Sequence, residues 1–332
     1  MMPHRFRMPW LALVVIFMLA ILVELVWYRD QPPPRPPLPS PNGYDDLLKA
    51  SESVTQSAGD YFELDRDGLR DWLAANAEPL RLVRAGLARQ CVIPMDSTPT
   101  NMNRLGAMKM LAQLLRAEGR LREMDNRPGD AARSYMDAIR FGNEMSRGGI
   151  LITRLVGIAC EAIGCRALAE VVPRVGPEDA RIVLQDLEKF DANRVTWEEV
   201  RRNEKYYARR LPSSRSNPVA RVMGWWQGRQ VLYLGETRHK MLMARERLLA
   251  GELALRCYEA EKGHPPARLD EGVTNYLSKV PQDPFSGRPM VYRSQGTHWL
   301  LYSIGPDGVD DGGRPAGRGS PVVGDIRFDS SW

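Results

Sequence analysis

An apolar run near the N-terminus is the strongest hydrophobic pattern in the chain. Between Pro9 and Trp27 every residue except Glu24 is apolar. As a helix this run rises about 27 Å, close to the thickness of the hydrocarbon core of a bilayer. Trp10 and Trp27 stand near its two ends, where interfacial aromatic residues are typical. The pattern predicts one transmembrane helix over residues 9–28.

The same run shares features with a cleaved secretory signal. Arg5 and Arg7 precede it, as basic residues precede the apolar part of a signal peptide. No small-x-small cleavage site occurs between Ala20 and Asp30, which favours a retained anchor. In both alternatives the basic end stays in the cytoplasm and the rest of the chain crosses the membrane. We expect a single-pass protein of the cell (inner) membrane, with residues 1–8 cytoplasmic and the bulk periplasmic or exoplasmic.

A proline-rich stretch separates this anchor from a long region of helical periodicity. Residues 29–43 contain seven prolines, which predicts an extended, semi-rigid spacer. Residues 44–234 then repeat apolar side chains at intervals of three and four, so we expect an α-helical domain there. Its clearest helices are expected at residues 105–121, 129–141, 150–172 and 196–210.

Two segments of this domain suggest how its helices pack. Residues 150–172 are almost apolar throughout but are interrupted by Arg154 and Glu161, which favours a core helix over a second membrane span. Residues 129–139 resemble the second helix of a tetratricopeptide hairpin, and this resemblance implies that helical hairpins stack on one another. We therefore expect a fold that is mainly α in this part of the chain.

The C-terminal part, residues 235–332, combines one long helical stripe with short strand-like runs. Apolar residues recur three and four positions apart at Met241, Ala244, Leu248, Gly251, Leu255 and Tyr258. Gly263 and the two prolines after His264 end this helix, because glycine caps it and proline cannot continue it. Residues 290–293 and 299–304 follow as predicted strands. The pattern predicts a small α+β module with a short antiparallel sheet.

The order of motifs in this module resembles the C-terminal half of the major pseudopilin of type II secretion. The matching motifs are Tyr258 with Gly263-His264-Pro265, Val280-Pro281-Gln282-Asp283-Pro284-Phe285-Ser286-Gly287, Tyr302-Ser303-Ile304-Gly305-Pro306-Asp307-Gly308, Asp325-Ile326 and Trp332. The resemblance covers roughly the last ninety residues. It implies a long helix packed on a small sheet, and a calcium ion held in the last loop.

The residues of that loop suit a hard cation. Calcium prefers six or more oxygen ligands. Carboxylates are available from Asp307, Asp310, Asp311 and Asp325, and the glycines between them let the backbone turn its carbonyls inward. We therefore expect calcium as a cofactor at these four aspartates. The alternative is that the Asp-Gly pairs only form tight turns.

Charge and cysteine content narrow the class of partner. A net charge of +5 over 332 residues suits an anionic membrane surface and gives no support for nucleic-acid binding. Basic and aromatic residues gather between residues 201 and 229. One interpretation is adhesion to an anionic envelope surface through Arg209, Arg210 and Arg215. The other is a solvated helix whose aromatic residues pack inward. The four cysteines form no C-x-x-C pair, so we expect no structural zinc. We expect buried free thiols; the alternative is that Cys160 and Cys165 pair with each other or with the other two cysteines.

Common catalytic motifs are absent from the sequence. It contains no Gly-x-Ser-x-Gly elbow, no phosphate-binding glycine loop with Lys-Ser or Lys-Thr, and no His-Glu-x-x-His. We expect a non-enzymatic, membrane-anchored envelope protein whose helical domain binds a protein partner. The alternatives are a divergent pseudopilin-like component of a secretion or fibre apparatus, and an envelope enzyme with a pocket between the two exported parts.

Overall fold

The computed structural model describes residues 37–55, 61, 63–94, 102–210, 218–296, 298–315 and 323–328, together with Met18. The predicted transmembrane helix at residues 9–28 lies outside these residues except for Met18, and so does most of the predicted spacer at residues 29–43. Among the residues that the structure describes, no helix has the length and apolar character needed to cross a membrane. The anchor therefore stays a prediction.

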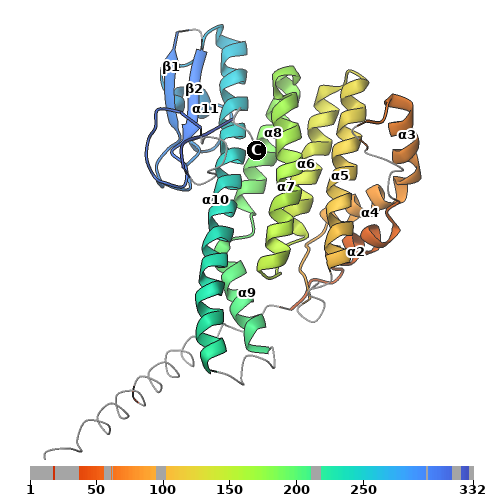
Figure 1. Cartoon of the computed structure of the whole chain (residues 1–332). Helices are drawn as coiled ribbons and strands as arrows, with labels where there is room; N and C mark the ends of the chain where they lie inside the picture. The colour runs from red at the N-terminus through yellow and green to blue at the C-terminus, as the bar shows by residue number, and fades with distance from the viewer. Residues whose placement is uncertain are drawn as a thin grey trace, which may run out of the picture. The chain divides into compact units, whose positions relative to one another are not determined.

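The described part of the chain is mainly helical and carries a small antiparallel sheet near its end (Figure 1). The α-helices are α2 (Gly43–Ser53), α3 (Arg66–Ala75), α4 (Ala77–Leu87), α5 (Met102–Met124), α6 (Pro128–Glu144), α7 (Leu151–Val171), α8 (Pro177–Ala192), α9 (Trp197–Arg210), α10 (Pro218–Lys262) and α11 (Leu269–Val273), and a 3-10 turn, η2, covers Val172–Arg174. The strands are β1 (Val291–Gln295), β2 (His298–Ser303) and β3 (Ile326–Arg327), in the order β1-β2-β3. The predicted fold class, mainly α with a small antiparallel sheet, is confirmed.

Helix ends follow the local signals in the sequence. Pro128 occupies the first turn of α6, where its missing N–H costs no hydrogen bond. The Thr196 hydroxyl accepts a hydrogen bond from the backbone N–H of Glu199 at 3.2 Å, which caps α9. Gly263 ends α10 with a positive φ of 75°, a conformation that glycine adopts without steric cost. Each of the four predicted helices of the domain coincides with an observed helix to within a few residues.

Close approach between α6 and α7 depends on glycine. Figure 1 shows α5, α6, α7 and α8 side by side. A Cβ atom added at Gly157 on α7 would lie 2.5 Å from the carbonyl oxygen of Gly142 on α6. One added at Gly164 would lie 2.6 Å from the carbonyl oxygen of Tyr135. Because real Cβ atoms do not approach so closely, only glycine at these positions allows the two backbones to pack at this separation.

The C-terminal module shares its core with the helical domain. Strand β2 packs on α10, where a Cβ at Gly251 would meet Leu301 at 2.8 Å. Leu301 and Ile326 of the sheet belong to the same buried cluster as residues of α6, α7, α8 and α10. Helix α10 runs without a break through residue 234, where the sequence suggested a domain boundary. The apolar stripe of α10 packs on α7 and α8 of the helical domain and on β2 of the C-terminal module, so this helix belongs to both parts.

A second buried cluster joins α2, α3, α4 and α5, and it also includes residues of α6 and α7. All four cysteines are buried, and each carries a free thiol in the structure. Every residue of the described hydrophobic cores lies between residues 38 and 332, and this part of the chain forms one compact unit.

Candidate functional site

The four aspartates predicted to bind calcium lie in the loops around β3, but most of their oxygens accept hydrogen bonds from the protein. Asp307 accepts from the backbone N–H groups of Val309 at 3.2 Å and Gly324 at 2.8 Å. Asp310 accepts from the Tyr302 hydroxyl at 2.7 Å, and from the backbone of Gly312 at 2.9 Å. These are the contacts of carboxylates that stabilise turns.

Asp325 differs from the other three because it is buried. Its Oδ2 accepts from the backbone N–H of Gly313 at 2.6 Å, while its Oδ1 is buried and makes no hydrogen bond with the described residues. Burial raises the pKa of this carboxyl, an effect that the Gly313 N–H partly offsets. Asp311 is exposed. Among the described residues no group of three histidine, cysteine or acidic side chains is arranged to hold a metal ion. Calcium at this loop therefore stays a prediction.

The basic residues predicted to contact an anionic surface lie at the far end of α9 and beyond it. Arg209 and Arg210 belong to α9, but their side chains lie outside the described residues. Arg215 lies outside the described residues altogether. Their role stays a prediction.

Two adjoining hollows on the helical domain form a feature that the sequence did not reveal, which we call the arginine groove. They share Arg84, Glu118 and Arg122. The first hollow measures about 350 Å³ and is lined by α4, α5, α6, the turn before α6 and α8. The second measures about 600 Å³ and is lined by α3, α4 and α5. Both hollows lie open at the surface.

Arginines dominate the open side of the first hollow. Those that line it are Arg84, Arg122, Arg127, Arg133 and Arg140. Their side chains are 35–52% exposed, whereas those of their partners Glu118, Asp130 and Asp137 are only 10–23% exposed. Asp186, also in the lining, is more exposed at 41%. A guanidinium has five N–H donors. An arginine that binds one of the less exposed carboxylates therefore keeps other donors for a ligand in the hollow.

The carboxylates under these arginines are held by several partners each. Glu118 pairs with Arg84 and also accepts from the Ser134 hydroxyl at 2.8 Å. Asp137 binds Nε of Arg84 at 3.2 Å. Burial raises the pKa of Asp137, and the charge of Arg84 offsets only part of this effect. The floor of the hollow is therefore a fixed ionic network, which keeps the arginines in place.

The second hollow adds apolar surface beside these charges. Its apolar lining consists of Leu73, Ala74, Ala77, Leu80 and Leu121, and Arg70, Arg81 and Asp125 stand at its margin. A ligand that spans both hollows would meet aliphatic side chains first and guanidinium groups next.

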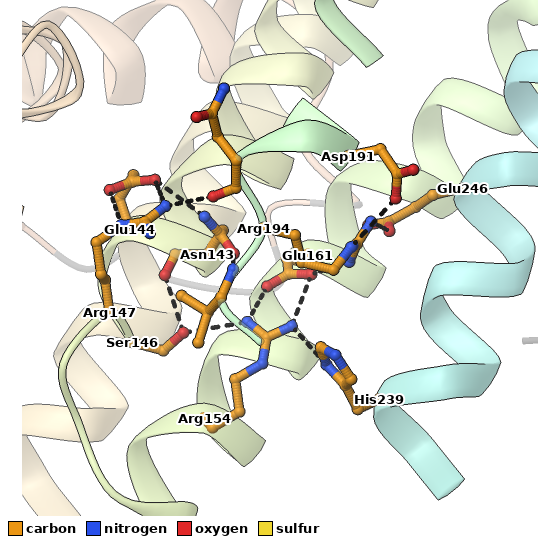
Figure 2. Close-up of polar contacts among 12 residues, drawn as sticks. Asn143, Glu144, Ser146, Arg147, Arg154, Glu161, Asp191, Arg194, His239 and Glu246 are labelled. Atoms are coloured by element: carbon orange, nitrogen blue, oxygen red, sulfur yellow. Dashed lines mark hydrogen bonds and ion pairs between the residues drawn. The ribbon is translucent and has the colours of Figure 1, made fainter. Parts of the chain in front are cut away.

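A cluster of charged groups lies inside the molecule, between α7, the α8–α9 connection and α10 (Figure 2). We call it the buried ion cluster; it consists of Arg154, Glu161, Arg194, His239 and Glu246. Arg154 binds both carboxylate oxygens of Glu161, and Nη2 of Arg154 lies 3.1 Å from Nδ1 of His239. Arg194 pairs with Glu246 and lies 3.5 Å from Glu161. The cluster thus ties three separate segments together.

Protonation in the cluster follows from its burial. Because a guanidinium only donates, Nδ1 of His239 accepts from Arg154, so its proton sits on Nε2. Burial and the charges of Arg154 and Arg194 lower the pKa of His239 to about 2, which keeps the imidazole neutral. Burial raises the pKa of Glu246, against the opposing charge of Arg194. These groups bind one another, and of the cluster Arg194 and Glu246 also line a cavity of about 60 Å³. We assign the cluster a structural role.

The space between the helical domain and the C-terminal module is small. A cavity of about 60 Å³ lies there, lined by α8, α10 and residues 277–282. Pockets for small-molecule substrates usually measure about 300–1,000 Å³. This cavity is much smaller than such pockets.

No model of a protein family, no curated protein and no solved structure matches this chain. The site must therefore be interpreted from its own geometry.

Proposed function

We propose that this chain is a non-enzymatic, membrane-anchored envelope protein that binds a partner protein through the arginine groove. The observation that carries the proposal is the pairing of the two hollows: five outward-facing arginines line one of them, and aliphatic side chains line the other. Stacked antiparallel helices commonly present such concave surfaces to extended segments of other proteins.

The chemistry of the groove favours an extended acidic segment with an apolar residue beside its carboxylates. Arginine binds carboxylates through paired N–H donors. The acidic groups of the groove are mostly less exposed than the arginines, so an approaching chain meets positive charge. Ala74 and Ala77, which are exposed, and the half-buried Leu121 then offer apolar contact to a neighbouring side chain of the same segment.

A direct test uses the fragment of residues 38–332, which contains every described core residue. Two fluorescein-labelled peptides serve as probes: one has two leucines followed by a run of glutamates, and the other has glutamines in place of the glutamates. The fluorescence anisotropy of each peptide is measured against fragment concentration. We expect saturable binding of the glutamate peptide, weakened by salt, and much weaker binding of the glutamine peptide.

Variants of the groove make the test specific. Arg127→Gln and Arg133→Gln should each weaken binding by roughly fivefold, about 1 kcal/mol for a partly exposed ion pair. Arg166→Gln is the matched control, because Arg166 is 56% exposed and paired with Glu170 on α7, outside the groove. Equal affinity for the two peptides would overturn the proposal, and so would no binding at about 1 mM, where the binding free energy is only about −4 kcal/mol.

The anchored location is part of the proposal and needs its own test. The apolar run at residues 9–28 with Arg5 and Arg7 before it supports an exported body. A reporter that is active only outside the cytoplasm, fused after Trp332, should therefore be active. Activity of a reporter that works only in the cytoplasm would contradict this topology.

A further inference from the structure

The hairpin formed by α9 and α10 exposes apolar side chains on α10 and basic side chains on α9. Figure 1 shows α9 beside the N-terminal half of α10, away from the sheet. The pair has a small core of its own, Val195, Trp197 and Val200, against which Leu151 and Leu232 pack. This core is separate from the two larger clusters.

Three large hydrophobic side chains on the hairpin are exposed. On α10, Val231 is 48% exposed, Tyr233 63% and Leu234 52%. On α9, Arg201, Arg202 and Lys205 are exposed. We call these six residues the hairpin surface. Exposure of a tyrosine and two aliphatic side chains to water is unfavourable, and their burial against another surface would remove this cost.

Positive charge is concentrated in the same part of the chain. The stretch from residue 201 to residue 229 contains eight basic residues and one acidic residue, Glu204, so it carries seven net positive charges. The whole chain carries +5, which means that everything outside this stretch is net negative. A surface that combines clustered arginine and lysine with exposed tyrosine and leucine complements anionic lipid headgroups and the apolar layer beneath them.

We propose that the hairpin surface docks on an anionic membrane and so orients the domain above the bilayer. This inference rests on the proposed anchor, because residues 29–43, if extended at about 3.1 Å per residue, hold the domain within about 45 Å of the lipid. Such tethering raises the local concentration of the membrane surface, so weak docking contacts suffice.

The test measures co-sedimentation of fragment 38–332 with phosphatidylcholine vesicles, with and without phosphatidylglycerol. Because the fragment lacks the anchor, the result does not depend on whether residues 9–28 span a membrane, and groove variants leave it unchanged. We expect binding only to vesicles with phosphatidylglycerol. Each of Arg202→Gln and Lys205→Gln should weaken it by about fivefold, since a basic residue near an anionic surface contributes about 1 kcal/mol.

The apolar half of the surface distinguishes lipid from a soluble polyanion. Tyr233→Ser and Leu234→Ser should also weaken vesicle binding, whereas Ile182→Ser should not, because Ile182 is 46% exposed on α8, away from the hairpin. Equal binding to both kinds of vesicle would overturn the proposal. The proposal would also be overturned if only the basic variants weakened binding, because a soluble polyanion needs no apolar contact. Dimerisation through Tyr233 and Leu234 in the absence of lipid would assign the surface to a second copy instead.

Discussion

Arg154 and Glu161 form an ion pair in which both side chains are completely buried. They lie two helical turns apart on α7, and Nη2 of Arg154 donates to Oε2 of Glu161 at 3.2 Å. Ser146 and His239 complete the contacts of Arg154. Burial of two charges is costly unless each finds its partner, so this pair constrains how α7 packs against its neighbours.

The first prediction concerns this pair. Arg154→Met or Glu161→Leu leaves one buried charge without its main partner, and each should lower the free energy of unfolding by about 3–5 kcal/mol. The double variant should lose clearly less than the sum of the two. Urea unfolding of fragment 38–332 measures all three.

Arg166→Met is the control for this prediction. Arg166 pairs with Glu170 on the same helix, but both side chains are more than half exposed, so the loss should stay below about 1 kcal/mol. Similar small losses for the buried and the exposed pair would contradict the prediction.

The second prediction concerns pH and His239. Its pKa is about 2 in the folded protein and about 6.5 when unfolded, so the unfolded chain binds more protons between these values. The stability that His239 contributes is present above pH 6.5 and is lost as the pH falls toward 2, with a slope that approaches about 1.4 kcal/mol per pH unit. His239→Gln should remove this slope while its amide oxygen still accepts from Arg154.

The comparison must allow for Glu246, whose pKa is raised by burial. A raised carboxyl pKa contributes stability that is lost as the pH rises, opposite to the effect of His239. The difference between the unaltered fragment and His239→Gln cancels this contribution, because Glu246 is present in both. A difference that does not change with pH between about 6.5 and 5 would show that His239 takes up a proton in the folded state.

The third prediction concerns the α6–α7 contact. Gly157→Ala places a methyl group 2.5 Å from the carbonyl oxygen of Gly142 and should cost about 1–3 kcal/mol as an overpacked core position. Gly106→Ala on α5 is the matched control, because its added Cβ meets no atom within 4 Å. It should instead raise stability by about 0.5–1 kcal/mol, since alanine is the better helix former. Thermal unfolding of both variants measures these changes in stability. A higher melting temperature for Gly157→Ala would contradict the packing argument.

The fourth prediction concerns calcium at Asp307, Asp310, Asp311 and Asp325. If the ion binds only the folded protein, a hundredfold excess over Kd adds about 2.7 kcal/mol, and fragment 38–332 should melt higher with calcium than with chelator. Asp307→Ala and Asp325→Ala should remove most of that difference, and magnesium should substitute poorly. Identical melting curves with calcium and chelator would mean that these carboxylates only accept the turn hydrogen bonds seen in the structure.

Local patterns in the sequence determined the helices and their ends. Apolar spacing of three and four located α5, α6 and α7, and Pro128, Thr196 and Gly263 marked helix ends because their effects act within one turn. The small sheet after α10 was predictable for the same reason, since strand runs and turn residues are also local signals. The continuity of α10 through residue 234 was not predictable, because no local signal shows that one helix packs on both the helical domain and the sheet.

Only the tertiary structure decided what the charged residues do. In the sequence, Arg154 and Glu161 were interruptions of an apolar helix, and packing made them partners of each other and of His239, 85 residues from Arg154. The arginine groove collects side chains from α3 to α8, and each of its arginines looks like an ordinary surface residue in its own helix. Contacts between residues so far apart depend on how helices stack, and helical periodicity carries no information about which neighbour a polar face will meet.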